Sequence, residues 1–192
     1  MKKVGVLGLQ GAVSEHVDRL AKLENVKPLV VKYKNEIEAV DALIIPGGES
    51  TAIGKLLADF ELTSTLKSRI LSGMPVWGTC AGMIILAKKL CNDERRHLEV
   101  MDIEVMRNGY GRQIDSFSTT VNLPELSANE IPLVFIRAPY VVNAAPNVKV
   151  LLRVNDKIVA CRQENMLATS FHPELTEDLS FHKYFVDLIK AS

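Results

Sequence analysis

The residue whose setting most favours chemistry is Cys80, in the motif Gly78-Thr79-Cys80-Ala81-Gly82. Apolar residues 76–77 predict a short buried strand before it, and the apolar stretch 83–86 predicts a helix that ends near the lysines at 88–89. A strand, a Gly-x-Cys-x-Gly turn and a helix form the thiol counterpart of a nucleophile elbow, whose small residues let a substrate approach and whose helix favours a thiolate. Taken alone, the motif is equally compatible with a buried core cysteine.

A histidine and a carboxylate near the end of the chain have the right types to activate this thiol. His172-Pro173-Glu174 follows the apolar run 166–171, which predicts a buried strand. The proline disfavours helical backbone at His172, and in extended backbone residues two apart project to the same side. Glu174 is therefore expected to orient the ring of His172, which would leave the second ring nitrogen free to act as a base. A surface loop with an incidental histidine is the alternative.

The segment Pro46-Gly47-Gly48-Glu49-Ser50-Thr51 follows another apolar run, residues 42–45. Two successive glycines leave backbone N–H groups accessible. Gly48 and the N–H of Ala81 would then form a two-donor oxyanion hole. The alternative is an ordinary Gly-Gly turn in which Ser50 is the N-cap of a helix at 51–59.

Length, charge and cysteine content narrow the class of protein. The 192 residues suffice for one domain with a full core. Lys plus Arg and Asp plus Glu both number 23, and this balance argues against nucleic acid or an anionic membrane as the main partner. Three cysteines without a Cys-x-x-Cys pair fit neither a disulfide framework nor a zinc site, and no metal or cofactor is expected. Without a signal-peptide pattern or a long apolar span, we expect a cytoplasmic protein.

Apolar runs in the first 90 residues predict strands that alternate with helices. The expected strands are 4–9, 29–31, 42–45 and 76–77, and the expected helices are 12–23, 51–59 and 62–71. Such alternation predicts a parallel sheet whose ligands bind at the carboxyl ends of the strands. Gln10, Gly47 and Cys80 would all lie at that edge.

The second half of the chain has a different pattern of residues, which begins with a charged loop at 92–97. Strand-like runs follow at 103–105, 117–123, 133–136, 148–154 and 157–161. Asn155-Asp156 predicts a hairpin turn, and we interpret these runs as antiparallel additions to the main sheet. A final helix is expected at 179–189. Because no linker or repeat interrupts the sequence, residues 1–192 are expected to form a single domain.

Three motifs together resemble the class I, triad-type glutamine amidotransferases: residues 78–82, 46–51 and 170–174. The sequence is also similar to the glutaminase subunits of pyridoxal 5'-phosphate synthase, through segments 5–12, 112–117, 135–139 and 172–178. The similarity therefore spans nearly the whole chain. It implies an α/β fold, a flavodoxin-like three-layer sandwich with a mainly parallel central sheet, added antiparallel strands and a cysteine nucleophile elbow.

The resemblance implies that the chain hydrolyses L-glutamine to L-glutamate and ammonia through a γ-glutamyl thioester on Cys80. His172 would take the thiol proton, protonate the departing ammonia and then activate water, while Glu174 orients its ring. Ammonia would pass to a (β/α)-barrel synthase subunit in a hetero-oligomeric complex, and that subunit would build pyridoxal 5'-phosphate from sugar phosphates.

The resemblance also assigns residues that bind glutamine or the partner. Those that would line the glutamine site are Gly47, Gly48, Glu49, Arg107, Ile136 and Arg137. An arginine suits the α-carboxylate of a free amino acid, although without the resemblance each arginine would be interpreted as part of a surface ion pair. Gln10 would lie near the partner contact.

Three other readings of the sequence remain open. A stand-alone cysteine hydrolase or chaperone-like protein of the flavodoxin type would share Cys80 without requiring His172 and Glu174. A non-catalytic regulatory subunit would keep the triad as a relic. A glutaminase that supplies a purine or histidine pathway is the third. Segments 112–117 and 135–139 separate it from the glutaminase of pyridoxal 5'-phosphate synthase. The remaining histidines are expected to be structural or solvated: His16, His97 and His182.

Overall fold

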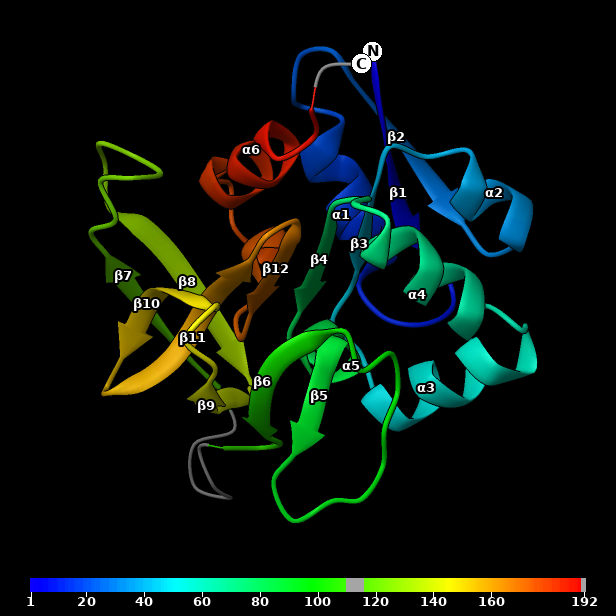
Figure 1. Cartoon of the computed structure of the whole chain (residues 1–192). Helices are drawn as coiled ribbons and strands as arrows, with labels where there is room; N and C mark the ends of the chain where they lie inside the picture. Colours follow the sequence, from blue (N-terminus) through cyan, green and yellow to red (C-terminus); the bar gives the residue numbers. More distant parts are fainter. Residues whose placement is uncertain (110–115, 191–192) are drawn as a thin grey trace.

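The protein, described by a computed structural model over residues 1–109 and 116–190, is built on a ten-stranded sheet (Figure 1). Five strands in one half of this sheet run parallel, in the order β2-β1-β3-β4-β12. Their bounds are β1 Lys2–Leu7, β2 Val26–Val31, β3 Ala42–Ile45, β4 Val76–Thr79 and β12 Met166–Thr169. Each lies within a few residues of a predicted run. This order is that of a flavodoxin-like sheet.

The other half of the sheet mixes strand directions. β12 is antiparallel to β11, β11 to β10 and β9, and β9 to β6, whereas β6 and the edge strand β5 are parallel. The bounds are β5 Ala87–Leu90, β6 Met101–Met106, β9 Tyr140–Ala144, β10 Lys149–Val154 and β11 Lys157–Gln163. Asn155 and Asp156 have φ of 49° and 62° between β10 and β11, which confirms the predicted hairpin turn.

Two features of this half differ from the predictions. β7 (Ser116–Val121) and β8 (Ile131–Ile136) pair with each other in a separate two-stranded sheet and do not extend the main one. The lysines at 88–89 do not end a helix, because the helix closes at Leu86 and the chain continues directly into β5. β5 and β9 were not predicted. Segment 112–115, which carries part of the family resemblance, lies outside the described residues.

Helices cover both faces of the sheet and make the fold a three-layer sandwich (Figure 1). α1 and α6 pack on one face, together with the β7–β8 sheet, and α2 to α5 pack on the other. The bounds are α1 Val13–Leu20, α2 Lys34–Glu38, α3 Ser50–Asp59, α4 Thr63–Leu71, α5 Ala81–Leu86 and α6 Ser180–Asp187. α2 was not predicted. No helix in the described ranges has the length and apolar character needed to cross a membrane.

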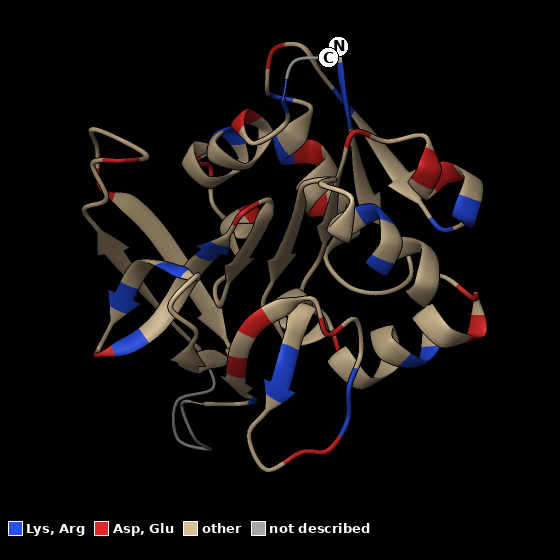
Figure 2. Cartoon of the chain, viewed as in Figure 1, with Lys and Arg blue, Asp and Glu red and all other residues tan. Residues whose placement is uncertain are grey.

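Charges of both signs are spread over the molecule. Figure 2 shows Lys and Arg interspersed with Asp and Glu along the elements of both halves. This mixed pattern agrees with the zero formal net charge and differs from the basic surface that nucleic-acid binding requires.

Two glycines shape the turn between β4 and α5. A Cβ atom on Gly78 would lie 2.4 Å from the carbonyl carbon of Gly82, and one on Gly82 would lie 2.1 Å from the carbonyl oxygen of Ile45 in β3. Neither distance is possible for a real side chain, so glycine is required for the backbones of β3, β4 and α5 to touch. The glycines expected to give a substrate access to Cys80 thus also set the backbone packing of the elbow.

We expect Gly82→Ala to lower the free energy of unfolding by roughly 1–3 kcal/mol, because the added methyl group must push the α5 backbone away from β3. Urea denaturation measures this change. Ser64→Ala, at an exposed position of α4, is the control and should change the free energy by less than about 0.5 kcal/mol. Equal stability of the two variants would contradict the packing role of Gly82.

Candidate active site

A cavity of about 500 Å³ opens at the carboxyl ends of the parallel strands. Ten residues predicted from the sequence to form the site line this cavity: Gln10, Gly47, Gly48, Glu49, Cys80, Ala81, Arg107, Ile136, Arg137 and His172. Glu174 does not line it and instead lies buried behind His172. The expectation that the ends of separate strands meet at one edge is therefore confirmed.

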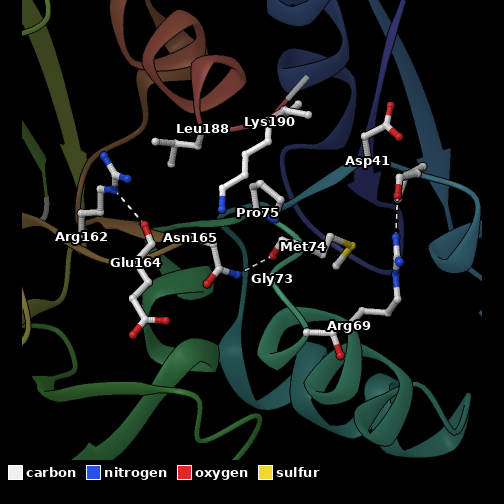
Figure 3. A pocket seen from close by; sticks show the side chains of 13 residues that line it. Asp41, Arg69, Gly73, Met74, Pro75, Arg162, Glu164, Asn165, Leu188 and Lys190 are labelled. Atoms are coloured by element: carbon white, nitrogen blue, oxygen red, sulfur yellow. Dashed lines mark hydrogen bonds between the residues drawn. The ribbon is translucent and has the colours of Figure 1, made fainter. Parts of the chain in front are cut away.

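A larger cavity, of about 620 Å³, lies at the opposite edge, beside the residues that precede β3, β4 and β12 (Figure 3). Three of its polar side chains donate to backbone oxygens. The side-chain amide of Asn165 donates to the carbonyl of Met74 at 2.7 Å, and Arg162 and Arg69 donate to the carbonyls of Glu164 and Val40. This cavity has no cysteine or histidine in its lining, so the candidate chemistry is confined to the Cys80 edge.

Cys80 has the backbone of a nucleophile elbow. Its φ of 49° and ψ of −104° lie outside the regions that non-glycine residues normally adopt. The backbone N–H of Cys80 donates to the carbonyl of Thr169 at 2.8 Å, which ties the elbow to the end of β12. The Sγ atom lies 3.9 Å from the carbonyl oxygen of Ile136, and 7% of the residue is exposed to the cavity.

His172 and Glu174 are paired as the sequence predicts, although by a different local geometry. Nδ1 of His172 lies 2.7 Å from Oε1 of Glu174, and because a carboxylate only accepts, this nitrogen carries the proton. Glu174 lies in a short 3₁₀ turn, Pro173–Leu175, and not in the extended backbone that was expected. His172 itself is non-helical, and its N–H donates to the carbonyl of Val134 at 2.8 Å.

The surroundings of His172 favour its charged form. Burial lowers the pKa of His172, but its interactions with the thiol of Cys80 and the carboxylate of Glu174 outweigh burial and raise the pKa to about 10. A free imidazole titrates near ~6.5, so His172 stays protonated at neutral pH and loses its proton only as the pH rises through about 10. A cationic ring next to a cysteine is the kind of neighbour that favours a thiolate over a thiol.

The two glycines at 47–48 fit closely between residues 10–12, which follow β1, and the catalytic side chains. The N–H of Gly47 donates to Oγ1 of Thr79 at 3.0 Å, and its carbonyl accepts from the N–H of Ala12 at 3.0 Å. A Cβ atom on Gly47 would lie 2.5 Å from the His172 ring, so only glycine lets the ring reach its place. Gly48 and Ala81 line the cavity beside Cys80, and their role as oxyanion donors stays a prediction.

Glu49 and Arg107 form an ion pair at the cavity wall. Nη2 of Arg107 lies 3.4 Å from Oε1 of Glu49. Glu49 also caps α3, because its carboxylate accepts from the N–H groups of Thr51 at 3.0 Å and Ala52 at 2.7 Å. Burial raises the pKa of Glu49, but these backbone donors outweigh it and the pKa is lowered. The N-cap assigned to Ser50 in the alternative interpretation is therefore wrong, since Glu49 holds that position.

Asp93 is a second partner of Arg107 that the sequence did not single out. Its Oδ2 lies 3.1 Å from Nη1 of Arg107, and hydrogen bonds from Arg95 hold the pKa of Asp93 well below its usual range. Arg95 in turn donates to Oγ1 of Thr51 at the start of α3. The only signal in the sequence was the dense charge of the loop 92–97.

Gln10 and the pair Ile136-Arg137 complete the rim of the cavity. Oε1 of Gln10 accepts from the N–H of Glu49 at 2.8 Å, so this side chain holds the glycine loop in place. Arg137 has a positive φ of 42°, and Ile136 is 37% exposed at the mouth of the cavity. That Gln10 contacts a partner remains a prediction.

Two histidines outside the predicted site lie directly behind it. His16 in α1 and His182 in α6 are both fully buried, and Nε2 of His16 lies 3.4 Å from Oε2 of Glu174. Both were expected to be structural or solvated, because nothing in the sequence near either one resembles a motif. Within residues 1–109 and 116–190, no group of His, Cys, Asp and Glu side chains is arranged to hold a metal ion.

An α/β fold with a cysteine elbow, a paired His-Glu and an adjoining glycine loop defines the class of triad-type glutamine amidotransferases. The profile of the SNO glutamine amidotransferase family matches residues 6–191, and the chain belongs to this family.

Curated relatives and a solved structure resemble nearly the whole chain. The pyridoxal 5'-phosphate synthase subunit PdxT of Ruminiclostridium cellulolyticum is 72% identical over 98% of this chain and all of its own length. The PdxT subunit of Clostridium botulinum is 54% identical over 97% of each chain. A crystal structure of a glutamine amidotransferase, 42% identical, covers 97% of this chain and 98% of its own with a TM-score of 0.91. PurLQS of Thermotoga maritima, 15% identical with a TM-score of 0.70, shares the fold.

We expect Glu174→Gln to slow the alkylation of Cys80 by iodoacetamide at pH 7. Without the carboxylate the pKa of His172 falls, so less imidazolium remains to stabilise the thiolate. Peptide mass spectrometry measures the rate at each cysteine. Cys91 is a reference within the same sample, because burial and Glu104 raise the pKa of its thiol independently of His172. Unchanged alkylation of Cys80 in the variant would contradict this coupling.

Proposed function

We propose that this chain is the glutaminase subunit of a pyridoxal 5'-phosphate synthase, with residues 1–192 acting as one amidotransferase domain. It hydrolyses L-glutamine and delivers the ammonia to a synthase partner. The observation that carries the proposal is the elbow cysteine, Cys80, in the same cavity as His172, whose ring is paired with buried Glu174. Family membership and 72% identity to a subunit of this synthase support the same assignment.

The reaction we propose begins when the thiolate of Cys80 attacks the side-chain amide carbon of glutamine. The carbonyl oxygen becomes an oxyanion, for which the N–H groups of Gly48 and Ala81 are the proposed donors. The C–N bond then breaks, His172 gives its proton to the departing ammonia, and a γ-glutamyl thioester remains on the sulfur. His172 next takes a proton from water, whose oxygen attacks the thioester. The C–S bond breaks and releases glutamate, which regenerates the thiolate of Cys80 beside a protonated His172.

The ion pair on the cavity wall is complementary to a free amino acid. The guanidinium of Arg107 offers donors to an α-carboxylate, and the neighbouring carboxylate of Glu49 offers acceptors to an α-ammonium group. Asp93 holds the guanidinium from its other side, so the pair is ordered before a substrate arrives. Ile136 and Arg137, together with the glycines at 47–48, are proposed to enclose the rest of glutamine.

The relatives' description as subunits supports a partner for this chain as well. We propose a (β/α)-barrel synthase subunit in a hetero-oligomeric complex, with Gln10 near the contact. The mouth of the Cys80 cavity carries two exposed apolar side chains, Ile136 and Leu175, which are 37% and 44% exposed and suit a surface that a partner covers. A cytoplasmic location stays a prediction.

The proposal predicts glutamate release from L-glutamine that rises when the barrel subunit is added and falls by roughly a thousandfold or more in Cys80→Ala, since the nucleophile is lost. An enzymatic assay for glutamate, with each chain alone and mixed, measures it. Cys91→Ala is the matched control and should retain activity, because Cys91 lies outside the Cys80 cavity.

Other outcomes of this assay identify the alternatives. Equal activity with and without the barrel subunit would favour a stand-alone cysteine hydrolase. No turnover in any mixture, despite complex formation, would favour a non-catalytic regulatory subunit.

Arg107→Ala is expected to raise KM for glutamine by roughly tenfold or more with a smaller change in kcat, because a charge-assisted hydrogen bond contributes about 1.5–3 kcal/mol to binding. Steady-state kinetics of the complex measure both constants. Arg153→Ala, an exposed arginine of β10, should leave them unchanged. A fall in kcat alone would place Arg107 in the reaction step and not in substrate binding.

A further inference from the structure

His16 is a fully buried side chain whose ring lies between three polar groups. Its Nδ1 lies 3.1 Å from Nε2 of His182, and its Nε2 lies 3.2 Å from Oγ1 of Thr79 and 3.4 Å from Oε2 of Glu174. These groups come from α6, from the strand before the elbow and from the turn after His172. One imidazole thus contacts groups from three separate elements.

The charge of Glu174 determines which nitrogen of His16 carries the proton. Oε2 of Glu174 is buried and has no hydrogen-bond partner among the described residues, and Nε2 of His16 faces it at 3.4 Å. A buried carboxylate oxygen requires such a donor, and a lone pair at Nε2 would be repelled by it. The proton therefore lies on Nε2, and Nδ1 must accept.

His182 supplies the donor that this arrangement needs. If Nδ1 of His16 accepts, then Nε2 of His182 donates, and Nδ1 of His182 carries only a lone pair. That atom is buried without a partner, which costs less for a lone pair than for an N–H group. The two rings thus form a directed chain from His182 to His16, whose Nε2 proton faces both Oγ1 of Thr79 at 3.2 Å and Oε2 of Glu174 at 3.4 Å.

Both rings are held neutral, as a directed chain of this kind requires. Burial, and the repulsion that His16 would feel from His182 or His172 if the rings were charged together, lower the pKa of His16 well below its usual value. Burial and the charge of Arg19 in α1 lower the pKa of His182 to about 3. The acidic group that faces the rings in the described part of the chain is Glu174, 3.4 Å from Nε2 of His16.

His16 also reaches the glycine loop through one hydroxyl. Oγ1 of Thr79 lies 3.2 Å from its Nε2, and the same oxygen accepts the N–H of Gly47 at 3.0 Å. Arg19, one turn further along α1, donates to the backbone carbonyl of Glu174 at 3.2 Å. α1 therefore contacts the side chain and the backbone of Glu174. It also contacts Thr79, whose hydroxyl binds the glycine loop at Gly47.

We propose that His16 and His182 are positioning residues for the glutaminase reaction. His182 sets the tautomer of His16. His16 then holds the carboxylate of Glu174 in the position from which that carboxylate orients the ring of His172. Thr79 links the ring of His16 to Gly47. The inference deepens the proposed function and rests on it. Packing alone does not account for the pair: the indole of Trp77 contacts both rings, at 5.7 and 5.0 Å between centroids, and apolar side chains would fill that space equally well.

The test compares variants that remove the directed chain with variants that retain it, in the complex with the barrel subunit. His16→Leu removes donor and acceptor, whereas the amide of His16→Gln supplies both. We expect His16→Leu to lower kcat by roughly tenfold or more with KM nearly unchanged, as for other residues that orient a reacting group. His16→Gln should return kcat to within about threefold of the wild type. His182→Leu and His182→Gln should show the same order with smaller effects.

Phe185→Leu is the matched control for lost packing. This residue lies one turn after His182 in α6, is fully buried and contacts Trp77 at 5.6 Å between centroids, but has no polar contact with the triad. It should lower the stability without lowering kcat. Trp77 is the single tryptophan of the chain, so its fluorescence reports whether the core around both rings is intact in every variant.

A second readout does not depend on turnover. The rate of Cys80 alkylation by iodoacetamide at pH 7 should fall in His16→Leu and recover in His16→Gln, because a misplaced Glu174 stabilises the imidazolium less. This alkylation rate tests the positioning role even if the complex shows no glutaminase activity. Absence of glutaminase activity would instead overturn the proposed function. Unchanged kcat and alkylation in His16→Leu, or equal losses in His16→Leu, His16→Gln and Phe185→Leu, would overturn the positioning role.

Discussion

One buried negative charge constrains the packing of the elements around the reacting cysteine. The carboxylate of Glu174 is 1% exposed, and an unpaired charge at such a depth costs several kcal/mol. His172 meets one of its oxygens at 2.7 Å, His16 faces the other at 3.4 Å, and Arg19 holds the backbone of the same residue. α1 and the turn after β12 must therefore pack together for the fold to tolerate this charge, and the same contacts orient the base that faces Cys80.

The parallel half of the sheet explains why the remaining groups arrive at one edge. Gln10, Gly47, Cys80 and His172 each follow a different strand, and the parallel pairing of β1, β3, β4 and β12 brings those strand ends together. Glycine is then required wherever two of these ends touch, as at Gly47 beside the His172 ring. Reactivity at this edge thus depends on backbone contacts as closely packed as those of the core.

What the sequence could predict follows from how local the controlling interactions are. The parallel strands, the turn at Asn155-Asp156 and the glycine loop were recognisable because apolar runs and turn residues act over a few positions. The apolar stretch after Cys80 has no periodicity, so the point at which α5 gives way to β5 was not visible. His16 lies far from Glu174 along the chain, and only packing of α1 brings the two together.

The lysines of β5 affect how this molecule can associate. β5 and β2 end the strand order of the main sheet, and β10 branches from it beside β11. At β5 and β2, unpaired backbone groups could pair with a strand of another chain. Lys88 and Lys89 are exposed on β5, and Pro28 lies within β2, where it lacks an N–H to offer. Both edges thus disfavour strand addition. Contacts with other proteins are therefore expected away from these two strands.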